Sequence, residues 1–138
     1  MDFKPSNMRA RHQMIERKTS VADLTINDLL HAAFPNEAMR ICIVMAVEER
    51  YLTARAITTQ EIFRFDRRSG TSVPSEADDA VCTIDSVVPL AHATRDALLG
   101  YDLRCRTSKE PDAGRLTVDE RQALLDAGQL YAANPVER

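Results

Sequence analysis

Apolar residues fill almost every position from 39 to 47, and Arg40 is the only polar side chain within that run. A helix that is apolar on nearly all sides has to be buried by other parts of a protein. Asn36 stands just before the run and Glu37 follows it, which is typical of a helix N-cap and an acidic first turn. The pattern therefore predicts a central buried helix over residues 36–57.

Caps and apolar periodicity predict further helices along the chain. They span residues 6–18, 20–34, 58–65, 75–88, 89–99 and 117–134, and the segments 75–88 and 89–99 are either two helices or one helix kinked at Pro89. Thr117 and Glu120 have the spacing of a capping box at the start of the last helix. Gly100 is expected to end the helix over residues 89–99. Residues 101–115 contain Pro111 and many charges, so we expect an exposed connection there. The predicted fold is all-α, a compact bundle or array of about five to seven helices around the central apolar helix.

The segment 51–65 allows a second interpretation. It is rich in threonine, isoleucine and aromatic residues, and its apolar and polar positions alternate in part. Both properties are typical of paired strands. A short β-hairpin at 51–65 is therefore the alternative to helix in this part of the chain.

The composition is that of a folded domain. The chain has 138 residues, of which 44% are hydrophobic and 28% charged, so it can bury a core without disulfides or metals. Its longest apolar run, residues 41–47, is far shorter than the roughly 20 residues of a membrane-spanning helix. The first residues lack the apolar stretch of a secretory signal. We expect a cytoplasmic protein with a basic N-terminal arm or short helix at 1–19 and a single helical domain at 20–138.

Basic residues are concentrated near the N-terminus. They are Lys4, Arg9, Arg11, Arg17 and Lys18, and they outnumber the acidic residues of the same segment although the whole chain has a net charge of -3. Such an arm can bind an acidic protein surface or nucleic acid. Arg67 and Arg68 would add to a nucleic-acid surface, but the acidic segment that follows them argues against a recognition helix for DNA.

The sequence predicts no catalytic, cofactor or metal site. Possible nucleophiles and bases are His12, His31, His92, Cys105, Ser69 and Ser72, and their spacing matches no known catalytic arrangement. The four glycines are isolated, so no phosphate-binding loop is present, and no histidine pair has metal-ligand spacing.

Cysteine usage adds one chemical hypothesis. Cys42 and Cys82 lie among apolar residues and are predicted to be buried in the core. Cys105 lies between Arg104 and Arg106 in the expected connection, and neighbouring cations lower the pKa of a thiol. Cys105 is therefore a candidate for a redox-responsive switch.

By elimination, the sequence predicts a non-enzymatic cytosolic protein-interaction module, such as a small regulator or an assembly adaptor. It would use a helical face and the basic arm to bind a protein partner. A homodimer is also expected, because one face of the apolar helix would need a covering subunit. The alternatives are a DNA-binding regulator that uses the arm with Arg67 and Arg68, and the redox switch at Cys105.

Overall fold

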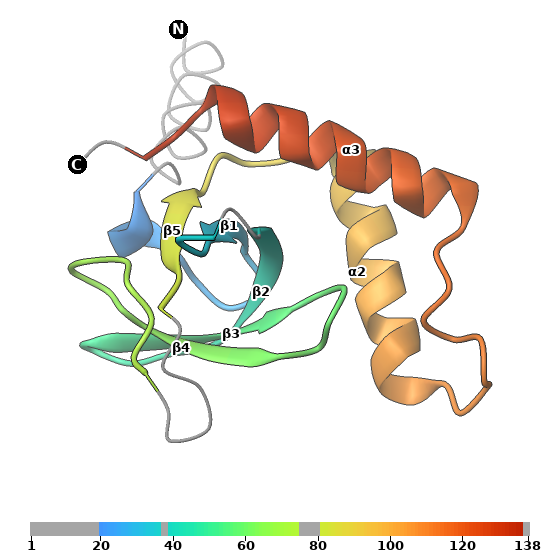
Figure 1. The fold of residues 1–138 in the computed structure, drawn as a ribbon, viewed down its shortest axis with the longest axis horizontal. Coiled ribbons are helices and arrows are strands. Elements are labelled where there is room, and N and C mark those ends of the chain that lie inside the picture. Colours follow the sequence, from blue (N-terminus) through green and yellow to red (C-terminus); the bar gives the residue numbers. More distant parts are fainter. Residues whose placement is uncertain (1–19, 37–38, 75–80, 137–138) are drawn as a thin grey trace, which may run out of the picture.

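A curled antiparallel sheet forms the body of the protein. The computed structural model describes residues 20–36, 39–74 and 81–136. Five strands follow the order β4-β3-β2-β1-β5 and curl into a half-barrel (Figure 1). The strands are β1 Leu29–Ala33, β2 Met39–Val47, β3 Tyr51–Ala56, β4 Ile62–Asp66 and β5 Thr83–Ser86. A short 3₁₀ helix, η1 (Val21–Asp23), precedes the sheet, and two long helices follow it, α2 (His92–Thr107) and α3 (Val118–Ala133).

The predicted all-α fold is wrong, and β2 shows why. The apolar run that predicted a helix over 36–57 forms this strand instead. Cys42 and Val44 point into the half-barrel, whereas Ile41 and Ile43 pack on its outer side against the helices. A strand covered on both faces reads as a continuous apolar run, which periodicity cannot distinguish from a buried helix. The segment 20–138 is therefore not an all-helical domain but a sheet with two long helices. The expected homodimer stays a prediction, but the apolar helix that supported it is absent from the described residues.

The alternative interpretation of residues 51–65 matches the structure. β3 and β4 pair in an antiparallel hairpin from Tyr51 opposite Asp66 to Arg55 opposite Ile62. Buried residues alternate with partly exposed ones along β3, as expected for a strand with one face in a core. Arg55 lies on the outer face of this strand, where it can reach the helices.

Two other predicted helices are also replaced. Residues 20–34 form η1 and β1 rather than one helix, because β1 is buried on both faces in the same way as β2. In the predicted helix 75–88, residues 83–86 form β5 instead, and residues 75–80 lie outside the described residues. The predicted helix 6–18 also lies outside the described residues. In both segments the apolar residues fit a strand period as well as a helical one.

Residues 70–73 bridge the open side of the half-barrel. Ser72 pairs with Phe65 of β4, and Thr71 pairs with Thr83 of β5. Gly70 has φ 73°, a left-handed conformation that favours glycine, and its carbonyl accepts a hydrogen bond from the N–H of Ile84 at 2.8 Å. The outer strands therefore leave little free edge between them.

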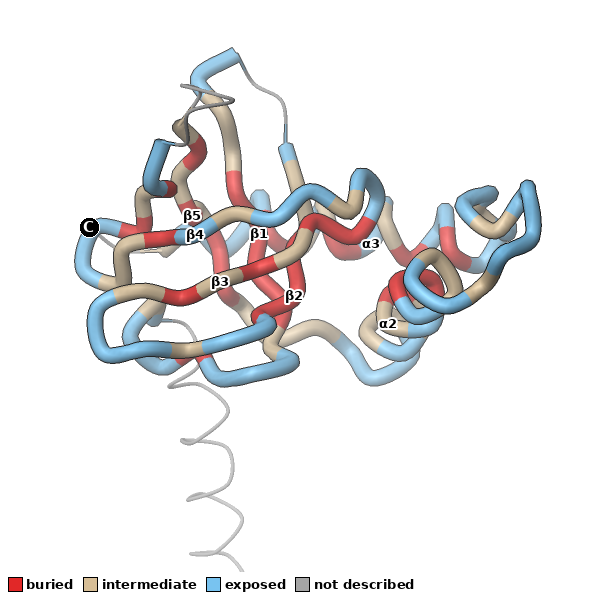
Figure 2. The backbone as a smooth tube through the Cα atoms, turned by 90° about the horizontal axis from the view of Figure 1, so that it is seen from below, coloured by how far each residue is buried: buried red, intermediate tan, exposed pale blue. Residues whose placement is uncertain are grey.

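The helices form a hairpin beside the half-barrel. The predicted end of a helix at Gly100 is wrong, because α2 continues to Thr107. The first half of the connection expected at 101–115 is therefore helical. The capping box at Thr117 and Glu120 is present and begins α3. Figure 2 shows buried residues inside the half-barrel and where the helices meet it, with the loop between the helices exposed. Within the described residues, neither helix is long and apolar enough to cross a membrane.

Candidate functional site

A pocket of about 300 Å³ lies between the half-barrel and the first turn of α2. Its walls come from the turn before β1, the connection from β5 to α2, and the start of α2. Most of its lining is apolar, and the residues are Leu24, Asp28, Leu29, Val87, Val88, Pro89, Leu90, His92 and Arg95. A mostly apolar pocket with a few polar groups is typical of a binding site, and this volume is at the low end for such sites.

The turn before β1 is held rigidly by local hydrogen bonds. The carboxylate of Asp28 accepts hydrogen bonds from the backbone N–H of Thr25 at 2.8 Å and from its hydroxyl at 3.1 Å. Asn27 adopts a left-handed conformation with φ 73°, and its N–H donates to the carbonyl of Val44 at 2.9 Å. This wall of the pocket is therefore fixed to β2.

The opposite rim of the pocket is electropositive. Arg95 is half-buried and donates from Nη2 to the carbonyl of Asn27 at 2.9 Å, and its other guanidinium N–H groups bond to no described residue. His92 lies beside it and is exposed. The N-cap of α2, Ala91, provides no side-chain hydrogen bond, and the first turn has no acidic residue. The partial positive charge of this helix terminus is thus left for another group.

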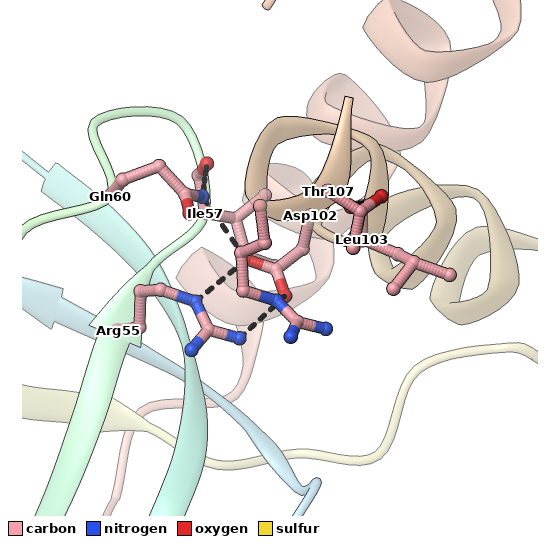
Figure 3. Close-up of polar contacts among 7 residues, drawn as sticks. Arg55, Ile57, Gln60, Asp102, Leu103 and Thr107 are labelled. Atoms are coloured by element: carbon pink, nitrogen blue, oxygen red, sulfur yellow. Dashed lines mark hydrogen bonds and ion pairs between the residues drawn. The ribbon is translucent and has the colours of Figure 1, made fainter. Parts of the chain in front are cut away.

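A buried ion-pair network fixes α2 on the half-barrel (Figure 3). Asp102 of α2 is 1% exposed and accepts hydrogen bonds from Arg55 Nε at 2.9 Å and Arg55 Nη2 at 2.6 Å. Gln60 and Arg106 each donate to it at 3.1 Å. Burial on its own would raise the pKa of Asp102, but the hydrogen bonds from Arg55, Gln60 and Arg106 hold that pKa below its usual value. The network therefore positions α2, and the pocket at its first turn, relative to β3.

A second ion pair joins α2 to α3. Arg104 donates to both carboxylate oxygens of Glu120 at 2.7 Å, and it also binds the carbonyls of Ala113 and Arg115 at 2.9 Å each. The hydrogen bonds from Arg104, assisted by those from Thr117 and opposed by burial, lower the pKa of Glu120 to about 2. The helical hairpin and its connecting loop are held together by this arginine.

Another hollow, of about 360 Å³, lies in that connecting loop. Most of its lining residues are polar or charged, and the full set is Arg104, Ser108, Glu110, Asp112, Ala113, Arg115, Leu116 and Thr117. The guanidinium of Arg104 is already occupied by Glu120 and two loop carbonyls. This hollow therefore offers a ligand less apolar surface and fewer available donors than the pocket at α2.

A histidine and an aspartate from neighbouring strands form a third polar cluster. His31 Nδ1 lies 2.6 Å from Asp85 Oδ1, and the His31 ring packs 5.2 Å from the ring of Tyr131. The ladder between β1 and β5 is interrupted at Asp85, which turns its side chain toward His31. His31 is only 5% exposed, so a substrate cannot reach it freely.

In the described ranges, no group of three His, Cys, Asp or Glu residues could hold a metal ion.

The predicted basic surface is only partly visible. Lys4, Arg9, Arg11, Arg17 and Lys18 lie outside the described residues. Arg67 is half-buried, and its guanidinium donates to the carbonyls of Glu48, Glu49 and Ala22 at 2.8, 3.3 and 3.0 Å. It therefore joins η1 to the turn between β2 and β3, and only Arg68 of the two arginines is exposed.

The candidate redox residue lies in a different environment from the one predicted. Cys105 belongs to α2 rather than to a loop, and it is half-buried against the core between sheet and helices. Its neighbours Arg104 and Arg106 are paired with Glu120 and Asp102. Burial, followed by the Cys105 thiol, raises the pKa of Tyr101 above its usual value. Reactivity of Cys105 stays a prediction.

Sequence reasoning did not find this pocket. The apolar periodicity predicts buried positions among its lining residues, and His92 is the lining residue that the sequence offers as a catalytic candidate. Arg95 did carry a signal, because a cation near a helix N-terminus is electrostatically unfavourable unless an anion is close. The sequence predicts a helix start at residue 89, whereas α2 begins at His92. The predicted start places Arg95 beyond the first turn, where this electrostatic argument does not apply.

The sequence matches no protein family, and comparisons found no similar curated protein and no similar solved structure. Only the residues of the chain itself therefore bear on its function.

Proposed function

We propose that this protein is a non-enzymatic protein-interaction module that binds a peptide segment of its partner at the pocket between the half-barrel and α2. The pocket itself carries the proposal, because it combines apolar walls with an arginine whose remaining donors form no hydrogen bond with a described residue. Apolar anchors and arginine contacts are the features that dominate binding at protein interfaces.

The chemistry of the described histidines supports binding rather than catalysis. His31 is enclosed by Asp85 and Tyr131. His92 lines the pocket, but the lining contains no serine, threonine or cysteine that it could activate as a nucleophile.

The backbone along one wall favours a peptide over a compact small molecule. Among the described residues, the backbone groups of Val88 and Leu90 form no backbone hydrogen bond. Both residues lie in the connection between β5 and α2, which belongs to no helix or strand. A peptide backbone could exchange hydrogen bonds with these groups while one of its side chains enters the pocket. A role as a small cytosolic regulator or adaptor is part of the same proposal.

Peptide selection on the full chain tests the proposal. Random peptides with free C-termini would be selected on the wild type, on Val88→Trp, which fills the pocket, and on Val73→Trp. Val73 is exposed and lies outside the pocket lining, so it is the matched control. We expect peptides enriched on the wild type and on Val73→Trp to lose at least about tenfold in affinity on Val88→Trp.

Two results would overturn the proposal. One is the absence of any enriched peptide on the wild-type chain. The other is binding that is equally strong on Val88→Trp, provided that circular dichroism shows this variant to be folded. If that variant does not fold, Val88→Phe and the partly exposed pocket residue Leu90, as Leu90→Trp, repeat the comparison.

A further inference from the structure

We infer that the pocket binds the C-terminal residue of the partner peptide, with an apolar side chain between its walls and the terminal carboxylate against Arg95. This inference rests on the proposed function and adds the chemistry of the recognised group. It names one ligand, a peptide that ends in an apolar residue with a free carboxylate.

The size of the pocket limits what enters it. A volume of about 300 Å³ accommodates one side chain of leucine or phenylalanine size with its backbone atoms, rather than several residues. The walls from Leu24, Leu29 and Val87 carry no polar side-chain atoms. An apolar side chain is therefore favoured over a charged one, which would lose its hydration without a partner.

The rim supplies the contacts that a carboxylate needs. The guanidinium of Arg95 is held in place by the carbonyl of Asn27, and its remaining N–H groups can donate to two carboxylate oxygens. The first turn of α2 adds positive potential from the same side, since no acidic side chain there neutralises it. One anchored arginine beside an apolar wall matches a carboxylate that lies next to an apolar side chain.

Asp28 narrows the choice of anion. Its carboxylate lines the same pocket and carries a like charge, although the hydrogen bonds from Thr25 hold it toward its own turn. A doubly charged phosphate would be repelled by Asp28 more strongly than a singly charged carboxylate. The presence of both Arg95 and Asp28 in one lining thus favours a singly charged anion over a doubly charged one.

Paired peptides separate the carboxylate from the rest of the ligand. Fluorescein-labelled peptides ending in Ala-Leu would be made with a free carboxylate and with a carboxamide, and their affinities measured by fluorescence anisotropy. The proteins are the wild type, Arg95→Gln, Arg95→Lys and the control Arg121→Gln, since Arg121 is an exposed arginine of α3.

For the wild type and the control we expect the acid to bind at least about tenfold more tightly than the amide. Arg95→Gln should reduce this ratio to below about threefold and leave affinity for the amide unchanged, while Arg95→Lys should keep part of the preference. Equal affinities for acid and amide on the wild type would overturn the inference.

Two further outcomes are informative. If the amide binds as well as the acid but both lose affinity on Val88→Trp, the carboxylate inference fails while the proposed function stands. If N-acetyl-leucine alone competes at the concentration at which the peptide binds, the ligand is a free carboxylic acid, and the assignment to a peptide terminus is wrong. Thermal unfolding of Arg95→Gln checks that loss of the bond to Asn27 has not unfolded the chain.

Discussion

Two buried tyrosines on the helices differ in what their hydroxyl groups contact. The hydroxyl of Tyr101 donates to the carbonyl of Gly114 at 2.6 Å. The hydroxyl of Tyr131 is buried and bonds to no described residue, and burial raises its pKa. A buried polar group without a partner costs free energy, whereas a buried hydrogen bond contributes about 1 kcal/mol to stability.

This difference predicts opposite effects of the same substitution. Tyr131→Phe should leave the free energy of unfolding unchanged or raise it by about 1 kcal/mol, because it removes an unsatisfied group. Tyr101→Phe should lower it by about 1 kcal/mol. Urea denaturation of both variants measures the effect, and a comparable loss in Tyr131→Phe would show that its hydroxyl has a stabilising partner.

At the scale of elements, the bond between α2 and α3 depends on the ionised form of Glu120. Its pKa falls from 4.5 to about 2 on folding, so the folded state holds this proton less tightly than the unfolded chain. The resulting stability is complete above about pH 5 and is lost as the pH falls toward 2.

Glu120→Gln should therefore cost about 1–3 kcal/mol at neutral pH and progressively less toward pH 2. Denaturant unfolding measured from pH 7 to pH 2 checks this, with Glu110→Gln in the exposed loop as the control. A stability difference between wild type and Glu120→Gln that does not change with pH would contradict the ion pair.

Some elements could be predicted from the sequence and others could not, depending on whether local residues or distant ones define them. The capping box at Thr117 was found because both partners lie within four residues of one another, so local chemistry defines them. The strand β2 was missed because both of its faces are covered by parts of the chain that are distant in sequence. Its β-branched residues favoured a strand, but the uninterrupted apolar run hid the alternation.

At the scale of the whole molecule, Asp102 joins the half-barrel to the helical hairpin. Asp102→Ala would leave Arg55, whose side chain is only 12% exposed, without its carboxylate partner. We expect this to cost about 3–5 kcal/mol, as is usual when one member of a buried pair is removed.

A double-mutant cycle isolates the pair itself. Arg55→Ala, Asp102→Ala and their combination should give a coupling energy of about 1–3 kcal/mol by chemical denaturation. The matched control is the Arg50–Asp66 pair, in which the Arg50 side chain is 70% exposed, and its coupling should stay below about 1 kcal/mol. Equal coupling in the two cycles would mean that apolar packing alone joins the half-barrel to α2.

The candidate site could not be predicted at this scale. Leu24 is far in the sequence from Val88 and Arg95, and only the curl of the sheet and the position of α2 bring it beside them. The pair of His31 and Asp85, which lie 54 positions apart, was missed for the same reason. Charge concentrated in one segment is visible in a sequence, whereas a pocket built by tertiary packing is not.

The most direct test of the binding site is a nitrogen-15 NMR titration of the full chain with a peptide that ends in Ala-Leu and has a free carboxylate. We predict saturable shifts of backbone amides in residues 24–29 and 87–95, whereas the amides of Val118 and Leu125, two exposed residues of α3, should not shift. No shifts at millimolar peptide, or shifts centred on α3, would contradict it.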